Sequence, residues 1–461
     1  MNFRVEKDVL GELEVPIDVY WGINTQRAIL NFQISGKTLP SIFILSLAEL
    51  KKACLMAIID LKLIEHKKAD AILKALDEML NQNKYLDQFP IDVFQTGSGT
   101  QTNMNMNEVL ANRANEILGY PLGKKSPVHP NDDVNKCQSS NDVIPSAMHI
   151  STIHMIQDKL IPSLEDLNKN LDIKIKEFKN IIKVGRTHLQ DAVPIPLSLE
   201  FEVYRKQFEI ALQRLIYMIN ELLFIPLGGT AVGTGLNAHE NFPNLAVQHL
   251  SKITGFRFKN NPVKAEGIAS HNTITTTSSI LRSLALSLLK MANDIRWMGS
   301  GPRAGLLELS LPQNEPGSSI MPGKVNPTQS EALIQVCLQV IGNDLTISFT
   351  EGYGSILDLN VCKPLMIYNL IESVDILSNA INSFIKHCLI KIEANENEIN
   401  SQLERMLMVV TKLTPILGYD QCSTIALKAY KEGKTIKQTI KEMGIKIEGD
   451  LDELLDPKKM I

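Results

Sequence analysis

The sequence predicts a mainly α-helical protein of three domains, and three observations support this prediction. Hydrophobic residues make up 44% of the 461 residues, which is enough for a large globular core. Apolar residues recur at helical spacing through the middle of the chain, over stretches of about 20 to 40 residues, well beyond the usual globular mean. The composition changes near residues 138 and 396, which predicts domains over 1–138, 139–396 and 397–461.

The first domain, residues 1–138, has the shortest predicted elements. Residues 5–15 alternate in polarity and are rich in turn formers, which predicts a short β-hairpin. Helical spacing over 41–61 and 66–80 predicts two shorter helices. We therefore expect an α-helical domain that begins with a small hairpin.

The second domain, residues 139–396, is predicted to be a bundle of long helices. Residues 280–289 are apolar around nearly the whole helix, so this helix must be buried on all sides. One chain would struggle to bury several such helices, so we expect the bundle to complete its core by oligomerising. The predicted ranges are 143–182 (one or two helices), 197–224, 273–298, 327–348 and 363–390.

The third domain, residues 397–461, is more polar and charged. Its helical patterns are short and cover 399–410, 421–432 and 436–442. We expect a small α-helical domain at this end of the chain.

Charge and cysteine content exclude several classes of protein. The net charge is 47 − 51 = −4, which gives no electrostatic case for nucleic acid or a membrane surface. No uninterrupted apolar run approaches the roughly 18–20 residues of a membrane span, and the charged first residues do not resemble a signal peptide. The six cysteines are scattered without a CxxC pair, which argues against disulfides, structural zinc and iron–sulfur clusters. We expect a cytoplasmic protein with no metal and no cofactor.

The segment Gly317–Pro327 is the most informative motif. Proline suits a first helical position, so we expect a helix from Pro327 with Asn326 at its N-cap and Gln329 completing a near capping box. Such a helix N-terminus attracts anions, and Lys324 adds a full positive charge. The loop also holds hydroxyls and flexible glycines, at Ser318, Ser319, Gly317 and Gly323. The segment predicts a carboxylate site beneath a mobile lid.

Two further loops place small or hydroxyl residues ahead of a helix. In the first, Gly97 and Gly99 allow a tight turn around Ser98 and Thr100, although simple capping of the helix explains this segment equally well. In the second, Ser139–Asn141 precede a long helix near Pro145, whose N-terminus can also hold an anion.

The segment before Ser139 has more polar groups than helix capping requires. It includes His129, Pro130, Asn131 and Asp132. A metal site at His129, Asp132 and Asp133 is a disfavoured alternative, because one histidine among carboxylates fits no strong ligand spacing.

His188 and a glycine-rich segment complete the candidates. His188 follows Thr187 at a proline-ended turn between two long helical patterns, where neighbouring polar groups can orient the ring for acid–base work. Residues 228–237 contain Gly-x-Gly but follow a helix and not a strand, so we reject a dinucleotide site.

Taken together, these segments resemble the class II fumarases of the fumarase/aspartase superfamily. The resemblance covers about residues 4–460. Aspartases typically differ at three of the matched places, with Ala-Gly for Gly97-Ser98, Gln for His188 and Ala for Gly323. The resemblance implies the three-domain fumarase/aspartase fold, with a long-helix bundle at the core of a homotetramer and active sites shared between three subunits.

The resemblance also implies roles for individual residues. Ser318 would be the base on the mobile loop, with His188 as the acid–base partner of the water and Glu331 polarising His188. The implied substrate ligands are Ser98, Gly99, Thr100, Ser139, Ser140, Asn141, Thr187, Ser319, Lys324, Val325 and Asn326. A second anion site would comprise His129, Pro130, Asn131 and Asp132. The implied reaction is the reversible hydration of fumarate to (S)-malate, a dicarboxylate, in the tricarboxylic acid cycle through an aci-carboxylate intermediate.

Two departures and two alternatives accompany this interpretation. The family usually has a basic residue where this chain has Ser126, and an Asp where it has Asn272, so the second anion site and one helix start are in doubt. Lys124 and Lys125 lie close to the first position. An aspartate ammonia lyase and a non-catalytic superfamily member are the alternatives, and His188 and Gly323 argue against the first.

Overall fold

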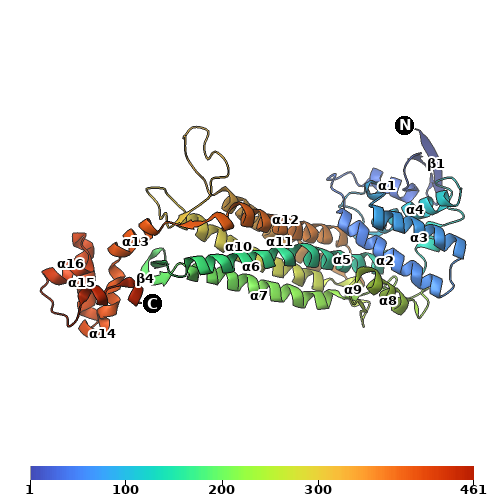
Figure 1. Ribbon diagram of the computed structural model, residues 1–461. Coiled ribbons are helices and arrows are strands. Elements are labelled where there is room, and N and C mark those ends of the chain that lie inside the picture. The colour runs from blue at the N-terminus through green and yellow to red at the C-terminus, as the bar shows by residue number, and fades with distance from the viewer. Residues whose placement is uncertain (1) are drawn as a thin grey trace. The chain divides into compact units, whose positions relative to one another are not determined.

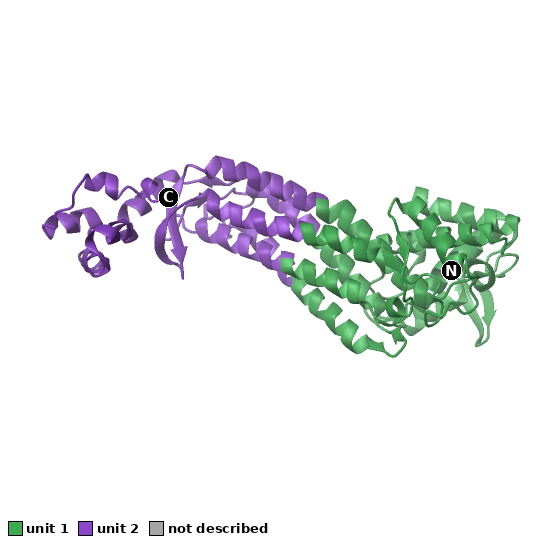
Figure 2. Ribbon diagram, turned by 90° about the horizontal axis from the view of Figure 1, so that it is seen from below, with its two compact units in different colours: residues 1–161, 213–283, 339–377 green, residues 162–212, 284–338, 378–461 purple. Residues whose placement is uncertain are grey.

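The computed structural model describes residues 2–461 and confirms a mainly α-helical chain (Figure 1). The chain divides into two compact units (Figure 2). Unit 1 contains the residues up to Ile161, together with Gln213–Ser283 and Gln339–Leu377; unit 2 contains Pro162–Leu212, Leu284–Leu338 and Ser378–Ile461. Each unit is described by itself below.

Unit 1 begins with the predicted hairpin. Strand β1 (Phe3–Asp8) pairs antiparallel with β2 (Gly11–Pro16) in continuous register from Phe3↔Pro16 to Asp8↔Gly11. Arg4 fixes the hairpin, because its guanidinium donates to Glu6 and to backbone oxygens of residues 16–21.

Helix α2 (Ser41–Asp60) is central to the core of unit 1. Most of its residues are buried, as an all-round apolar sequence requires, and it packs against α3, α5 and α8. The other elements of this part of the unit are α1 (Ile23–Asn31), α3 (His66–Gln82), η1 (Leu86–Gln88), α4 (Thr100–Ile117), η2 (Pro130–Val134) and α5 (Ser140–Met155). The predicted helices over 41–61 and 66–80 are thus confirmed.

The later segments of unit 1 add short elements. They are β5 (Phe224–Ile225), α8 (Phe242–Thr254), β6 (Lys259–Asn260), α9 (Glu266–Ala269), β8 (Ser355–Ile356) and β9 (Leu359–Asn360). Strand β5 pairs parallel with β6, and β8 pairs antiparallel with β9.

The long helices confirm the predicted pattern. The first predicted range forms α5 and α6 (Ile161–Phe178), joined by the π-helical turn η3 (Ile156–Leu160) just before Pro162. Proline cannot donate to the helical ladder, which accounts for a bulge at this point. The other long helices are α7 (Ser198–Leu222), α10 (Asn272–Met298), α11 (Thr328–Gly354) and α12 (Lys363–His387), each with residues in both units.

Unit 2 contains a hairpin that the sequence did not predict. Strand β3 (Ile182–Thr187) pairs antiparallel with β4 (Gln190–Pro196), with a bulge between Val184 and Arg186. The expected turn between two helices is therefore the tip of a β-hairpin. The sequence analysis did not predict this hairpin because β4 contains prolines, and proline argues against a strand assignment.

The C-terminal part of unit 2 consists of short helices, as predicted. Helix α13 (Glu396–Arg405) ends earlier than the expected 399–410, because Met406 adopts an extended backbone. The remaining elements are β7 (Leu309–Ser310), η4 (Leu389–Lys391), β10 (Glu393–Ala394), η5 (Leu407–Leu413), α14 (Thr414–Leu417), α15 (Tyr419–Glu432), α16 (Ile436–Glu442), α17 (Leu451–Leu454) and η6 (Pro457–Lys459). Strand β7 pairs with β10.

Within residues 2–461, helix α11 alone is long and apolar enough to cross a membrane by length and composition. Core helices of soluble proteins pass the same test, so this is weak evidence for a membrane span. Only 33% of its most apolar window is buried within the chain, so this helix presents an unusually large apolar surface.

Candidate active site

The predicted site residues fall into one group in unit 1 and one in unit 2. Unit 1 holds Ser98, Gly99, Thr100, His129, Pro130, Asn131, Asp132, Ser139, Ser140 and Asn141. Unit 2 holds Thr187, His188, Ser318, Ser319, Lys324, Val325, Asn326 and Glu331.

In unit 1, the structure brings three predicted hydroxyls together at the start of two helices. The oxygens of Ser98 and Thr100 lie 2.7 Å apart, and those of Thr100 and Ser140 lie 2.8 Å apart. Thr100 begins α4 and Ser140 begins α5, so this chain of hydroxyls lies where two helices present free N–H groups. The arrangement suits an anion such as a carboxylate.

Two glycines let the loop around Ser98 pack closely against neighbouring segments. A Cβ on Gly97 would lie 1.3 Å from the carbonyl oxygen of Val361, so no larger residue fits there. Gly99 has φ +76°, a left-handed conformation that favours glycine. The position of Ser98 therefore depends on both neighbours.

The N-terminus of α5 carries a complete capping box. The Ser139 hydroxyl accepts from the backbone N–H of Asn141 at 3.2 Å, and the Asp142 carboxylate accepts from the backbone N–H of Ser139 at 2.9 Å. A capping box satisfies N–H groups that would otherwise be unpaired. It fixes the first turn of α5, and with it Ser140 and Asn141.

The residues of the predicted second anion site form a separate turn. His129 caps the π-helical turn η2, because its Nδ1 accepts from the N–H groups of Asn131 and Asp132, both at 3.2 Å. A cation, Lys68, lies beside this turn: its Nζ is 3.1 Å from a carboxylate oxygen of Asp133. Nζ of Lys125 donates to the carbonyl oxygen of Lys7 at 3.2 Å.

In unit 2, His188 stands at the tip of the β3–β4 hairpin. Thr187 pairs with Gln190, so His188 and Leu189 form a two-residue loop, with φ of 56° and 58°. Such turns favour Asn-Gly, because non-glycine residues are strained there. Strained residues concentrate at functional sites, so this geometry favours a functional role for the exposed His188.

Strand β3 of this hairpin is held by a buried carboxylate, Glu308. Glu308 has no exposed surface, and it lies 2.6 Å from the guanidinium of Arg186 and 3.3 Å from Nζ of Lys183. Arg186 also donates to Gln402 in α13 at 2.9 Å. The strand that leads to His188 is therefore tied to two other segments of unit 2.

The Gly317–Pro327 segment forms a loop closed at its base (Figure 1, between α10 and α11). The N–H of Gly317 donates to the carbonyl oxygen of Lys324 at 3.0 Å, and the Asn326 amide donates to the Gly317 carbonyl oxygen at 2.5 Å. Nζ of Lys324 lies 2.5 Å from Oδ1 of Asn326. The loop thus holds its cation and its amide side by side.

Ser318 lies in a small nest of backbone donors within this loop. Its hydroxyl oxygen accepts from the N–H groups of Ile320 at 3.2 Å and Met321 at 3.0 Å. Donors to this oxygen would stabilise negative charge on it. Ser319, Lys324, Val325 and Glu331 are exposed.

The predicted cap of α11 was wrong in detail. The helix begins at Thr328, and the carbonyl oxygen of Pro327 accepts its first helical bond, from Glu331. Asn326 closes the loop and does not cap the helix, while Gln329 accepts from the Ser383 hydroxyl. The contact between Asn326 and Gly317 joins residues nine apart, which local cap patterns cannot anticipate.

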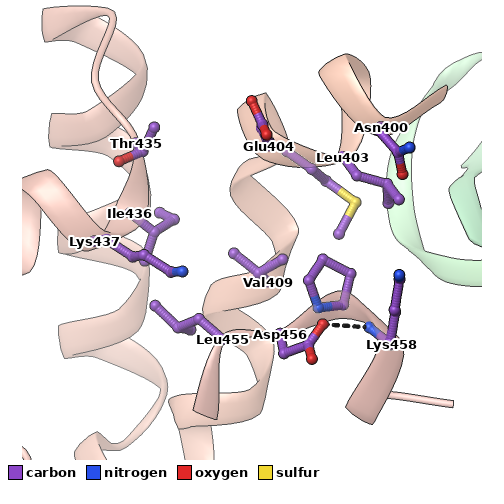
Figure 3. Close-up of a pocket in the computed structure, with 12 residues that line it drawn as sticks. Asn400, Leu403, Glu404, Val409, Thr435, Ile436, Lys437, Leu455, Asp456 and Lys458 are labelled. Atoms are coloured by element: carbon purple, nitrogen blue, oxygen red, sulfur yellow. Dashed lines mark hydrogen bonds between the residues drawn. The ribbon is translucent and has the colours of Figure 1, made fainter. Parts of the chain in front are cut away.

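Unit 2 has a cavity beside this loop and another among its C-terminal helices. One, of about 360 Å³, borders the loop and adds a cation that the sequence analysis missed, Arg296; it is lined by Arg296, Trp297, Gly299, Ser300, Gly301, Lys324, Val325, Asn326 and Pro327. The other, of about 700 Å³, lies among the C-terminal helices and contains no predicted site residue (Figure 3). It mixes apolar side chains such as Leu403 with charged ones such as Lys437.

Comparisons with known proteins identify the family. The lyase family matches residues 11–342, and the fumarase C C-terminus family matches residues 409–461. The class II fumarate hydratase of Thermosynechococcus vestitus is 48% identical over 96% of this chain and 94% of its own length. That of Campylobacter jejuni is 46% identical over 100% and 99%.

This chain belongs to the class II fumarate hydratase family. Solved structures agree with the assignment: a class II fumarase from Schistosoma mansoni superposes with a TM-score of 0.97 at 38% identity, covering 100% of this chain and 99% of that one. A fumarate lyase:delta crystallin from Brucella melitensis, bound to cobalt, superposes with a TM-score of 0.95 at 40% identity and the same coverage. The predicted fumarase/aspartase fold is thereby confirmed.

Proposed function

We propose that this chain is a fumarate hydratase, which interconverts fumarate and (S)-malate. One observation carries the proposal. This chain is 46–48% identical to class II fumarate hydratases over nearly all its length. The residues that the resemblance assigns to the reaction are His188, Ser318 and Glu331. The hydroxyl cluster and the loop cation support it, because both suit the carboxylates of a small dicarboxylate.

In the malate-to-fumarate direction, Ser318 takes the proton from C3. The electron pair left behind spreads into the adjacent carboxylate, which becomes a dianionic aci-carboxylate. The Ser318 oxygen accepts two backbone N–H groups, which supports an ionised form of this otherwise weak base. Lys324 and Asn326 would stabilise the developing carboxylate charge, and one such donor is typically worth roughly 3–4 kcal/mol.

His188 handles the leaving group. The C2–O bond breaks as the electron pair returns to form the double bond, and His188 supplies the proton that converts the departing hydroxide to water. Glu331 would polarise His188. Ser98, Thr100, Ser140, Asn141 and Thr187 would hold the substrate carboxylates. The reverse sequence hydrates fumarate.

We propose a homotetramer in which three subunits supply each site. The long helices support this, because they expose large apolar side chains that a soluble monomer would bury. On α11, Leu345 and Phe349 are 59% and 54% exposed, and the ring of Phe349 stacks on that of Tyr353 at 5.7 Å. Exposed apolar residues also occur on α7 and α10, including Tyr217 and Trp297.

We also propose a domain division, a second anion site and a cellular compartment for this protein. The domain division 1–138, 139–396 and 397–461 follows from composition. The second anion site at His129–Asp132 has Lys68 nearby, paired with the adjoining Asp133. A reducing compartment such as the cytoplasm suits a chain whose six cysteines are all free thiols.

Ultraviolet absorbance of the purified protein mixed with (S)-malate tests the activity. A rise from the conjugated double bond, in the presence of chelator, is the expected result. A rise with L-aspartate and none with malate would transfer the assignment to an ammonia lyase. No rise with either substrate, from a folded oligomer, would support a non-catalytic member.

A further inference from the structure

The glycine-rich turn at residues 228–235, which the proposed chemistry does not use, is fixed against α5. A Cβ on Gly228 would lie 2.3 Å from Cγ of Pro243, and one on Gly233 would lie 2.4 Å from the backbone nitrogen of Ala265. Both glycines also have positive φ, of 82° and 95°. Packing and backbone conformation therefore leave this turn one position, and only glycine fits at these two places.

Asp142 binds this turn to the start of α5. One carboxylate oxygen accepts from the backbone N–H groups of Gly228 and Thr230, both at 2.9 Å. The other accepts from the N–H of Ser139, also at 2.9 Å. Asp142 has no exposed surface, so a single buried carboxylate joins two segments about 90 residues apart in the sequence.

The glycine-rich turn also contacts Asn141, a predicted substrate ligand. The side-chain amide of Asn141 donates to the carbonyl oxygen of Ala231 at 2.8 Å, which fixes the orientation of this amide. The residue before Ala231 is strained: Thr230 is β-branched and has φ +54°. Its hydroxyl is buried and finds no hydrogen-bond partner within residues 2–461. Asp142 holds Thr230 in this conformation through its backbone N–H.

We infer that Asp142 is a positioning residue: it locks the Gly228–Ala231 turn onto the N-terminus of α5 and thereby orients Asn141 for the substrate carboxylate. This inference rests on the proposed function. Burial raises the pKa of Asp142 to about 6, opposed by its three N–H donors. Burial of a carboxylate costs desolvation free energy. Asp142 offsets this cost by accepting three backbone N–H groups, which an apolar residue could not do.

Asp142→Asn tests the role with little change in volume. An amide has only one acceptor oxygen, so its NH₂ group must face either the Ser139 N–H or the pair from Gly228 and Thr230. We expect KM for malate and fumarate to rise about tenfold or more, with a smaller change in kcat, because binding is affected more than proton transfer.

Glu108→Gln provides a matched control. Glu108 is also a buried carboxylate of unit 1 that accepts three backbone N–H groups, from Gly22, Asn24 and Thr25. It contacts no predicted site residue through these bonds. If Asp142 had only a structural role, both variants would lower thermal stability and leave KM unchanged, and this result would overturn the inference.

A double-mutant cycle with Asn141→Ala decides whether Asp142 acts through Asn141. We expect Asp142→Asn to raise KM much less in the Asn141→Ala background, because the orientation of Asn141 no longer matters. Additive effects would overturn the inference. A wild-type protein without hydratase activity would instead overturn the proposed function, so the two failures are distinguishable.

Discussion

The predicted substrate ligands of unit 1 and the predicted reactive groups of unit 2 have opposite surroundings. In unit 1, Ser98 is only 6% exposed and belongs to a chain of hydroxyls anchored on two helix starts. In unit 2, the reactive groups His188 and Glu331 are exposed, on a hairpin tip and a first helical turn, and Ser318 is half-buried on a loop. One chain therefore holds the unit 1 ligands in fixed positions but leaves two of the three reactive groups, His188 and Glu331, exposed.

This difference bears on how the site works. Polar groups that bind a charged substrate gain from being fixed in advance, because no reorganisation is needed on binding. Exposed reactive groups gain the exclusion of water only when another surface covers them. The comparison thus favours an active site completed by assembly.

Replacement of the reactive groups should have the largest effect. Ser318→Ala and His188→Asn should each lower kcat by about 10²–10⁴-fold, the usual contribution of a positioned acid or base. Both side chains lie outside the core, so thermal stability should hardly change. The ultraviolet assay measures the rate, and His239→Asn is the control, since His239 is an exposed histidine outside the predicted site. Full activity of Ser318→Ala would remove Ser318 from the mechanism.

Mixing two inactive variants should test the comparison directly. If the unit 1 and unit 2 residues of one site come from different subunits, Ser140→Ala and Ser318→Ala chains dissociated and reassembled together should form some intact sites. Random assembly predicts about a quarter of the wild-type activity. If each site is built within one chain, no activity would be recovered. That result would contradict an active site completed by assembly. Each variant reassembled alone is the control.

Gly97→Ala should damage the unit 1 group specifically. The added Cβ would overlap the carbonyl oxygen of Val361, and we expect a loss of about 3 kcal/mol of stability together with a raised KM. Gly36→Ala is the matched control: Gly36 also belongs to unit 1, and a Cβ there meets nothing within 4 Å at φ +71°. It should cost only about 1 kcal/mol of backbone strain. Equal unfolding free energies for the two variants in urea would contradict this packing account.

The smallest predicted effect concerns pH and unit 1. His149 is buried and its Nδ1 lies 2.9 Å from the carbonyl oxygen of Leu222, and burial lowers its pKa from 6.5 to about 4. The folded state therefore binds fewer protons than the unfolded state between these values. Its contribution to stability is complete above pH 6.5 and falls as the pH drops toward 4, by about 2 kcal/mol at pH 5.

Urea unfolding of wild type and His149→Gln at pH 7 and pH 5 measures this contribution. The stability difference between the two proteins should shrink or reverse on acidification, while the effects of titratable groups that do not interact with His149 cancel. A difference independent of pH would show that His149 is not held neutral by burial.

The sequence predicted the regular parts of the fold well, because helical periodicity is a local signal. Helix α10 was expected over 273–298 and found over Asn272–Met298, and the first hairpin was also anticipated. The β3–β4 hairpin was missed, since its loop is His188-Leu189 and not the Asn-Gly that signals such turns.

The candidate site was predictable only in part. The hydroxyl-rich starts of α4 and α5 followed from residue type and spacing. The roles of Asp142 and Asn326 did not, because their partners lie in distant or unexpected segments, at residues 228–230 and at Gly317. An acidic residue three places after a serine cap signals a capping box, but nothing local announces a second use of the same carboxylate.

The hairpin that carries His188 is held partly by a residue from the C-terminal part of the chain. Arg186 is held by Glu308 and by Gln402, whose amide also donates to the carbonyl oxygen of Leu306 at 2.7 Å. Gln402 lies in α13, outside every predicted catalytic motif. A chimera that exchanged the C-terminal helices between two relatives would therefore separate the histidine from part of its support. We therefore expect substitution of a residue in α13 to alter the position of His188, although α13 contains no predicted catalytic residue.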